Sequence, residues 1–171
     1  MKTQRNLLSL LLVILCLQLG FSQEFQVPKD LNFESPEDFK KIEPQVVNCI
    51  DWLALTPVNE QVEKRKEANA FLMKWASETR SLTIEIRPFQ LELTQKNSPL
   101  LTAFIGGWVK HVIQHPSDNK NKVATNVAGL QNLMNVYTLN KGNGLKKDRK
   151  IEKLKRMDAN ELQAWVQEQL K

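Results

Sequence analysis

The sequence predicts an all-α protein, folded as a single compact bundle of about five to six helices. Two observations favour this class. Apolar residues recur at helical spacing in several long segments, and helix-start signals stand in front of those segments. At most one short extended segment is expected, near residues 82–87, where apolar and polar side chains alternate. A lone strand has no partner to bond, so the sequence leaves open whether residues 82–93 are extended or helical.

The first 22 residues have the three parts of a secretory signal peptide. Lys2 and Arg5 give a positive start, residues 7–19 form an almost unbroken apolar run, and residues 20–22 form a small-any-small cleavage pattern. The apolar run is shorter than the roughly 20 residues that a membrane-spanning helix needs. We therefore expect export to the periplasm or the extracellular space, with no transmembrane span after signal removal.

The cysteines predict a mature chain without an internal disulfide. Cys16 lies inside the predicted signal, and Leu15 before it is not the small residue that a lipoprotein signal carries, so lipid attachment is the less favoured alternative. Signal removal leaves Cys49 alone, so the core must stabilise the fold without a disulfide. Because Cys49 lies in the apolar run VVNCIDWL, we expect a buried small hydrophobe rather than a nucleophile.

The charge balance gives no indication of a nucleic-acid partner. The whole sequence has a formal net charge of +5, from 24 basic and 19 acidic residues. Removal of the signal takes away Lys2 and Arg5 and leaves a net charge of +3. So small an excess is not typical of nucleic-acid binding.

After the signal, residues 23–34 are expected to form an extended lead-in and residues 35–171 a single helical domain. The first helix of the domain begins at Ser35, where a serine cap is followed by a proline and two acids. Pro44 interrupts its apolar spacing, which predicts a kink or a restart. The helix is expected to end before Pro57.

Three further helices are expected before the C-terminal region. Apolar spacing predicts them at about residues 59–77, 99–115 and 120–140. Ser98 repeats the serine–proline start for the second of these. The C-terminal region is expected to form two helices joined near Asp158, which begins a capping-box pattern. The four tryptophans fall on four different helices and are interpreted as core anchors: Trp52, Trp75, Trp108 and Trp165.

Two adjacent glycines stand inside the helix expected at 99–115. Gly106 and Gly107 each cost about 1 kcal/mol relative to alanine in a helix interior, so a compensating gain is expected. The favoured gain is close backbone approach to the helix expected at 120–140, which carries Gly129 on the border of its apolar arc. The alternative is a π-bulge or kink that opens a pocket.

His111 and His115 follow the glycines one helical turn apart and are weak candidates for a metal site. Asp118 would be a third ligand. A zinc-hydrolase helix would carry a glutamate directly after the first histidine, where this chain has Val112. The sequence offers no further histidine, and zinc sites usually use three or four protein ligands. We therefore predict no metal and no cofactor.

The basic segment 145–156, LKKDRKIEKLKR, has a local charge of +5, so the rest of the mature chain is slightly acidic. Ile151 and Leu154, extended by Leu145 and Met157, would form a narrow apolar stripe that docks while the cations stay solvated. The segment is either an ordinary solvated helix face or a contact for an anionic partner. The contact residues would be Lys146, Lys147, Arg149, Lys150, Lys153, Lys155 and Arg156.

No phosphate-binding glycine loop, nucleophile elbow or cysteine-rich metal motif is present in the sequence. The first hypothesis is therefore an exported, non-enzymatic helical domain that binds a protein or an envelope component. One alternative is a carrier of a small apolar ligand, with a cavity near Gly106. The other is an enzyme whose site is assembled from distant residues, for which the candidates are His111, His115, Asp51 and Asn69.

Three stretches carry a resemblance: LALTPVNEQVEKRKEANAFLMKW, LLTAFIGGWVKHVI and NVAGLQNLMNVYTLNKG. They resemble a group of small exported all-helical proteins of unknown function from Gram-negative bacteria, over residues 42–171. The shared signals are packing residues, namely the tryptophans, the glycines and Asn69. The resemblance implies an exported helical fold and carries over no catalytic or binding residue.

Overall fold

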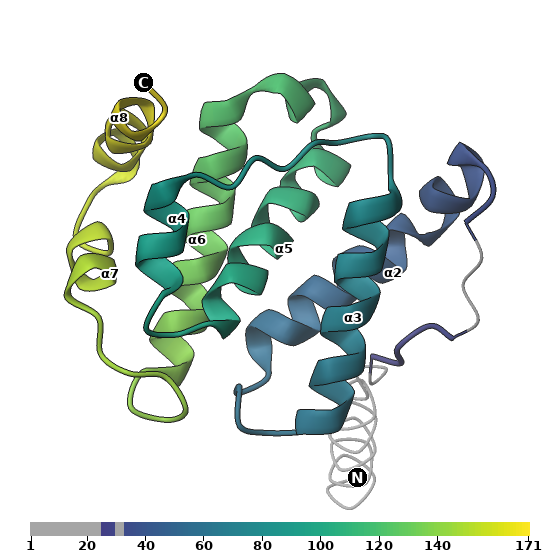
Figure 1. Ribbon diagram of the computed structural model, residues 1–171, viewed down its shortest axis with the longest axis horizontal. Helices are drawn as coiled ribbons and strands as arrows, with labels where there is room; N and C mark the ends of the chain where they lie inside the picture. The colour runs from purple at the N-terminus through teal and green to yellow at the C-terminus, as the bar shows by residue number, and fades with distance from the viewer. Residues whose placement is uncertain (1–24, 30–32) are drawn as a thin grey trace, which may run out of the picture.

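The computed structural model describes residues 25–29 and 33–171, so the predicted signal peptide and Cys16 lie outside the described residues. The described chain is all-α, as predicted, with seven α-helices and one short 3₁₀ helix (Figure 1). Its only bridge of β type joins Lys141 to Leu145 within the described part. The helices are α2 (Pro36–Leu55), α3 (Val62–Glu78), α4 (Pro88–Thr94), α5 (Pro99–Gln114), η2 (Pro116–Lys120), α6 (Lys122–Asn140), α7 (Arg149–Leu154) and α8 (Ala159–Gln169).

Helix α5 lies in the middle of the molecule (Figure 1). Helix α6 packs along one side of it, and α2 and α3 lie on the other side. Helices α7 and α8 lie beyond α6, at the edge farthest from α2 and α3. This place suits α5 because its sequence is apolar on nearly every side, which is typical of a central helix.

Helix α2 begins as predicted, but it runs through Pro44 without a restart. Ser35 accepts a hydrogen bond from the backbone of Asp38, and the Asp38 carboxylate accepts one from the Ser35 backbone at 2.9 Å. This capping box satisfies backbone donors at the helix start. Pro44 has no backbone N–H to donate to the carbonyl four residues earlier in the helix. Because Pro44 is exposed, water can solvate that carbonyl.

Helix α4 resolves the segment that the sequence left open between extended and helical. Residues 82–87 form neither helix nor strand, and Pro88 starts a helix instead of only closing the segment before it. The Gln90 side chain accepts a hydrogen bond from the Arg87 backbone at 2.7 Å, and it donates one to Asn126 of α6 at 2.7 Å. The helix has seven residues, too few to show a helical period.

The structure shows how the other predicted helices begin, and three of these starts differ from the prediction. Ser98 does not cap α5, because its own backbone is helical and its side chain accepts no capping hydrogen bond. Helix α3 starts at Val62, after Gln61 adopts the left-handed region at φ 44°. Asn121 caps α6 by accepting a hydrogen bond from Ala124 at 3.1 Å. The capping box at Asp158 is confirmed.

The predicted close approach of α5 and α6 is confirmed at the glycines. A Cβ atom added at Gly107 would lie 2.5 Å from the Ala128 carbonyl oxygen and 3.0 Å from the Cα of Gly129. A Cβ at Gly129 would lie 2.6 Å from the Phe104 ring. Gly106 faces the other way, toward Ile50 of α2. Only residues without a Cβ allow this spacing, which explains glycine at both contact positions.

The tryptophans pack against the core, as predicted. Trp75 and Trp108 are buried, and Trp52 and Trp165 are half-buried against the core cluster. The indole N–H of Trp75 donates to the Phe39 carbonyl at 3.2 Å, which joins α3 to α2. Buried tryptophan N–H groups usually find such a partner.

Candidate functional site

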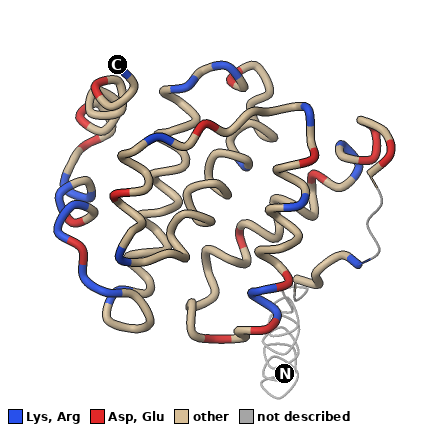
Figure 2. Tube along the Cα trace, viewed as in Figure 1, with Lys and Arg blue, Asp and Glu red and all other residues tan. Residues whose placement is uncertain are grey.

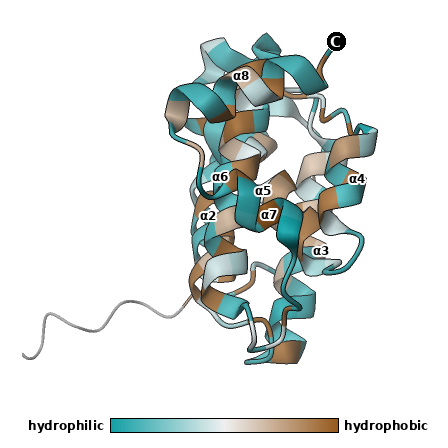
Figure 3. Cartoon of the chain, turned by 90° about the vertical axis from the view of Figure 1, so that its left-hand side faces the viewer, coloured by the Kyte–Doolittle hydropathy of each residue, from teal (hydrophilic) through white to brown (hydrophobic). Residues whose placement is uncertain are grey.

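The basic segment lies at the outer edge of the molecule, over α7 and the residues on either side of it (Figure 2). Leu145, Ile151 and Leu154 are buried, so the predicted apolar stripe docks against the rest of the domain. Figure 3 views this side of the molecule, with α7 in front. We name its seven cationic residues the basic edge: Lys146, Lys147, Arg149, Lys150, Lys153, Lys155 and Arg156.

Buried hydrogen bonds hold the start of α7 in place. Asp148 is buried, and its carboxylate accepts hydrogen bonds from the backbones of Lys150 at 2.8 Å and Ile151 at 3.4 Å. The hydroxyl of Tyr137 in α6 accepts a hydrogen bond from the Asp148 backbone at 3.0 Å. The cap therefore orients α7 so that its apolar residues point inward and its cations outward.

Asn97 attaches a second part of the chain to the basic edge. Its side chain donates to the Lys146 carbonyl at 2.9 Å and accepts from the Lys146 backbone N–H at 2.8 Å. This pairing brings Lys96 beside the edge, with its ammonium 3.5 Å from the Asp148 carboxylate. Lys96 is an exposed cation that was not predicted to lie at this edge, because no local sequence signal connects it to a segment 49 positions away.

Most cations of the basic edge have no acidic partner. Lys150 pairs with Glu92 at 2.7 Å, and Lys155 lies over the ring of Tyr137. Glu152 lies in the same segment, but it pairs with Lys141, and this hydrogen bond holds the pKa of Glu152 below its usual value. Among the described residues, no acid forms an ion pair with the remaining five: Lys146, Lys147, Arg149, Lys153 and Arg156.

The predicted metal candidates come together only in part. The His111 ring nitrogen Nε2 lies 2.9 Å from the Asp118 carboxylate, and the rings of His111 and His115 are 4.9 Å apart. In the described part of the chain, no group of three or more histidine, cysteine, aspartate or glutamate side chains is placed to hold a metal ion. The observed contact ties the end of α5 to the 3₁₀ helix that follows it.

The four residues named for an enzyme site do not share one cavity. Asp51 forms an ion pair with Lys110 between α2 and α5. Asn69 lines a cavity between α2, α3, α5 and α6, which neither Asp51 nor His111 lines. No convergent set of acid, base and nucleophile is therefore formed by these candidates.

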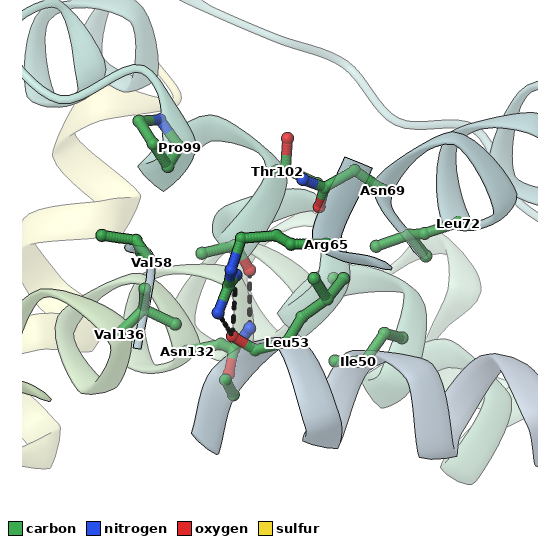
Figure 4. A pocket seen from close by; sticks show the side chains of 13 residues that line it. Ile50, Leu53, Val58, Arg65, Asn69, Leu72, Pro99, Thr102, Asn132 and Val136 are labelled. Atoms are coloured by element: carbon green, nitrogen blue, oxygen red, sulfur yellow. Dashed lines mark hydrogen bonds between the residues drawn. The ribbon is translucent and has the colours of Figure 1, made fainter. Parts of the chain in front are cut away.

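The cavity beside Asn69 lies where a pocket near Gly106 was considered (Figure 4). Its volume is about 20 Å³, which suits a single water molecule rather than an apolar ligand. Arg65 forms part of its wall and donates to the carbonyls of Leu53, at 3.1 Å, and Thr56. These bonds satisfy the last carbonyls of α2, so Arg65 has a structural role here.

Cys49 is a buried core residue, as predicted. Its thiol donates to the Ala68 carbonyl at 3.3 Å across the contact of α2 with α3. Burial raises the pKa of the Cys49 thiol to about 12. The thiol therefore stays protonated at neutral pH and lacks the thiolate that a nucleophile requires.

No family model, curated protein or solved structure matches this chain. The resemblance to small exported helical proteins therefore stays a prediction. Among the described helices, none combines the length and the apolar character that crossing a membrane would require. The basic edge is the surface on which a functional proposal can be built.

Proposed function

We propose that this protein is an exported, non-enzymatic helical domain that binds an anionic protein surface or envelope component through its basic edge. One observation carries the proposal: five exposed or half-exposed cations lie together on one edge without an acid to pair with. Elsewhere several cations pair with acids, as Lys74 does with Glu78 and Lys122 with Glu85. The basic edge differs because its five unpaired cations fall within 11 consecutive residues, 146–156.

The charges at this edge repel one another, and this repulsion opposes folding slightly. An anionic partner would remove the repulsion and gain attraction with each cation. Such exposed charges act over about 8 Å at physiological ionic strength, so binding through them must weaken as salt rises. The buried stripe beneath α7 holds the cations in place without using their charge.

Binding to vesicles tests the proposal. Wild-type protein without its signal is mixed with vesicles of phosphatidylglycerol and phosphatidylcholine, and with an acidic polypeptide, polyglutamate, as a protein-like partner. The bound fraction is measured by co-sedimentation over a range of salt concentrations. We expect binding to at least one of the two anionic probes, falling steeply with salt, and none to vesicles of phosphatidylcholine alone.

The variant that carries Lys147→Glu, Arg149→Glu and Lys153→Glu should lose this binding. Its control reverses three exposed lysines at the far end of the molecule: Lys29, Lys40 and Lys41. Both variants change the net charge equally, so only the position of the charge differs. Equal binding of the edge variant and the wild type, or equal loss in both variants, would overturn the proposal.

A further inference from the structure

The turn that follows α6 contains the one asparagine–glycine pair of the sequence, Asn143 and Gly144. Both residues are exposed, at the lower end of α6 in Figure 1. An asparagine side chain can react with the backbone nitrogen of the residue that follows it. Glycine offers that nitrogen without a Cβ atom beside it, so this reaction meets the least steric hindrance at an asparagine–glycine pair.

Hydrogen bonds fix the turn but leave the nitrogen of Gly144 without an acceptor. The backbone N–H groups of Asn143 and Leu145 both donate to the Asn140 carbonyl, at 2.8 Å and 3.0 Å. The N–H of Gly142 donates to the Leu145 carbonyl at 2.9 Å. The N–H of Gly144 donates to no group among the described residues. This nitrogen can therefore lose its proton and react without breaking a hydrogen bond of the fold.

The fold requires a glycine at this position. Gly144 has a φ of 98°, which residues with a side chain rarely adopt. A Cβ atom added to it would also lie 2.5 Å from a methyl carbon of Val58. The packing that excludes a Cβ atom here also keeps the reactive nitrogen unhindered.

A distant part of the chain polarises the amide of Asn143. Asn59 lies between α2 and α3, and its side-chain nitrogen donates to Asn143 Oδ1 at 2.8 Å. When a nitrogen attacks the Asn143 amide carbon, negative charge develops on this oxygen, and a donor already in place stabilises it. The two residues are 84 positions apart, so only the folded chain provides this donor.

Asn97 lacks these features and serves as the internal comparison. It is 4% exposed, and its side chain both donates to and accepts from the Lys146 backbone. Loss of its amide nitrogen would leave the Lys146 carbonyl without this donor. The residue after it, Ser98, also carries a Cβ atom.

We propose that Asn143 deamidates spontaneously in the folded protein, with Asn59 as the donor that assists the reaction. The Gly144 nitrogen gives up its proton and forms a bond to Cγ of Asn143. The bond between Cγ and Nδ2 then breaks, and ammonia leaves with the proton. Water opens the resulting cyclic imide at either of its carbonyls, which gives aspartate or isoaspartate. The reaction oxidises and reduces nothing, and it needs no partner at the basic edge.

Peptide mass spectrometry tests the site. The protein without its signal is incubated in the folded state at pH 6 and at pH 8, and samples are digested with trypsin. Peptide 142–146 contains Asn143, and peptide 97–110 contains Asn97. We expect Asn143 to lose its amide at least about 10-fold faster at pH 8, because the Gly144 nitrogen reacts once its proton has left. Peptide 97–110 should keep its amide at both pH values.

Matched variants separate this site from the general reactivity of an exposed asparagine. Asn143→Gln keeps an amide but would have to close a larger and less favoured ring, so peptide 142–146 should stay unmodified. Asn59→Ala removes the donor to Asn143 Oδ1 and should slow the reaction of the folded protein at least about 3-fold. The neighbouring exposed change Glu60→Ala should leave the rate unchanged. In urea, Asn59→Ala and the wild type should react equally.

Two results would overturn the proposal. One is an Asn143 amide that persists in the folded protein under conditions in which the urea-unfolded chain has lost half of it, because the fold would then protect the site. The other is an equal or faster reaction of folded Asn59→Ala, which would mean that Asn59 does not assist. Neither result depends on whether the basic edge binds an anionic partner.

Discussion

The contact between α5 and α6 and the basic edge at α7 are built in opposite ways. At the first, two backbones touch through Gly107 and Gly129, and Asn132 donates across the contact to the Ala103 carbonyl at 2.7 Å. At the second, a narrow apolar stripe is buried while a row of cations stays in water. The α5–α6 contact therefore depends on close backbone packing, whereas the basic edge is distinguished by its exposed charges.

The two regions should therefore tolerate substitution to different degrees. Interiors are packed closely, so a single added methyl group is felt at the centre. Exposed charges contribute little to stability, and substitutions among them usually change it by less than about 0.5 kcal/mol. Changes at the centre should thus alter folding, and changes at the edge should alter binding alone.

The reactivity of a thiol should show the largest contrast between the buried core, here the contact of α2 with α3, and the basic edge. Cys49 in the native protein should react with iodoacetamide at pH 9 more than about 100-fold more slowly than in urea-unfolded protein, because only the thiolate reacts. The pKa of the buried Cys49 thiol, about 12, lies above the ordinary thiol value of 9.0. The protonated thiol therefore stabilises the fold fully below pH 9, and this contribution is lost as the pH rises toward 12.

A matched thiol at the basic edge provides the control. The variant Cys49→Ala with Lys147→Cys moves the one cysteine of the described residues to an exposed position, where native and unfolded rates should agree within a few-fold. Mass spectrometry of the alkylated protein measures both. Similar native rates at the two positions would contradict the burial of Cys49.

Substitution of Gly107 should have the largest effect on stability. Gly107→Leu should lower the free energy of unfolding by about 3 kcal/mol, because its side chain would meet fixed backbone atoms of α6. Gly106→Ala is the control, since its Cβ would meet the movable end of the Ile50 side chain at 3.2 Å. That variant should stay within about 1 kcal/mol of the wild type. Urea unfolding measures both, and an unchanged midpoint for Gly107→Leu would exclude the close contact.

Removal of the Asn97 side chain should have a smaller effect, at the border of the basic edge. Asn97→Ala removes both hydrogen bonds to the Lys146 backbone and should cost about 1 to 2 kcal/mol. The control Asn143→Ala removes an exposed side-chain bond to Asn59 and should cost less than about 0.5 kcal/mol. Hydrogen exchange at the Lys146 amide should speed up in Asn97→Ala alone. Equal exchange rates of the Lys146 amide in both variants would contradict the hydrogen bonds between Asn97 and the Lys146 backbone.

Reversal of charge on the basic edge should change stability least. The variant with Lys147→Glu, Arg149→Glu and Lys153→Glu should unfold within about 0.5 kcal/mol of the wild type, because none of these residues forms an ion pair in the described chain. Thermal unfolding checks this, beside the vesicle assay. A large loss of stability would mean that the cations support the fold, and the contrast with the centre would fail.

Local sequence signals were sufficient to predict the helical class, most helix limits and the apolar stripe under α7. These follow from signals within a few residues of one another, such as the capping boxes at Ser35 and Asp158 and the apolar spacing of α5. The close contact at Gly107 was also predictable, because two glycines inside a helix need a compensating gain. Interactions between residues close in sequence are sufficient to predict these features.

The position of α4, the addition of Lys96 to the basic edge and the contact of Asn59 with Asn143 could be seen only in the folded protein. The Gln90 side chain of α4 bonds Asn126, which lies 36 positions away, and Asn97, next to Lys96, bonds Lys146, which lies 49 positions away. Side chains so far apart in the chain meet only after the core has packed. A local sequence pattern predicts the structure that one segment favours, but it does not predict which other segment will pack against it.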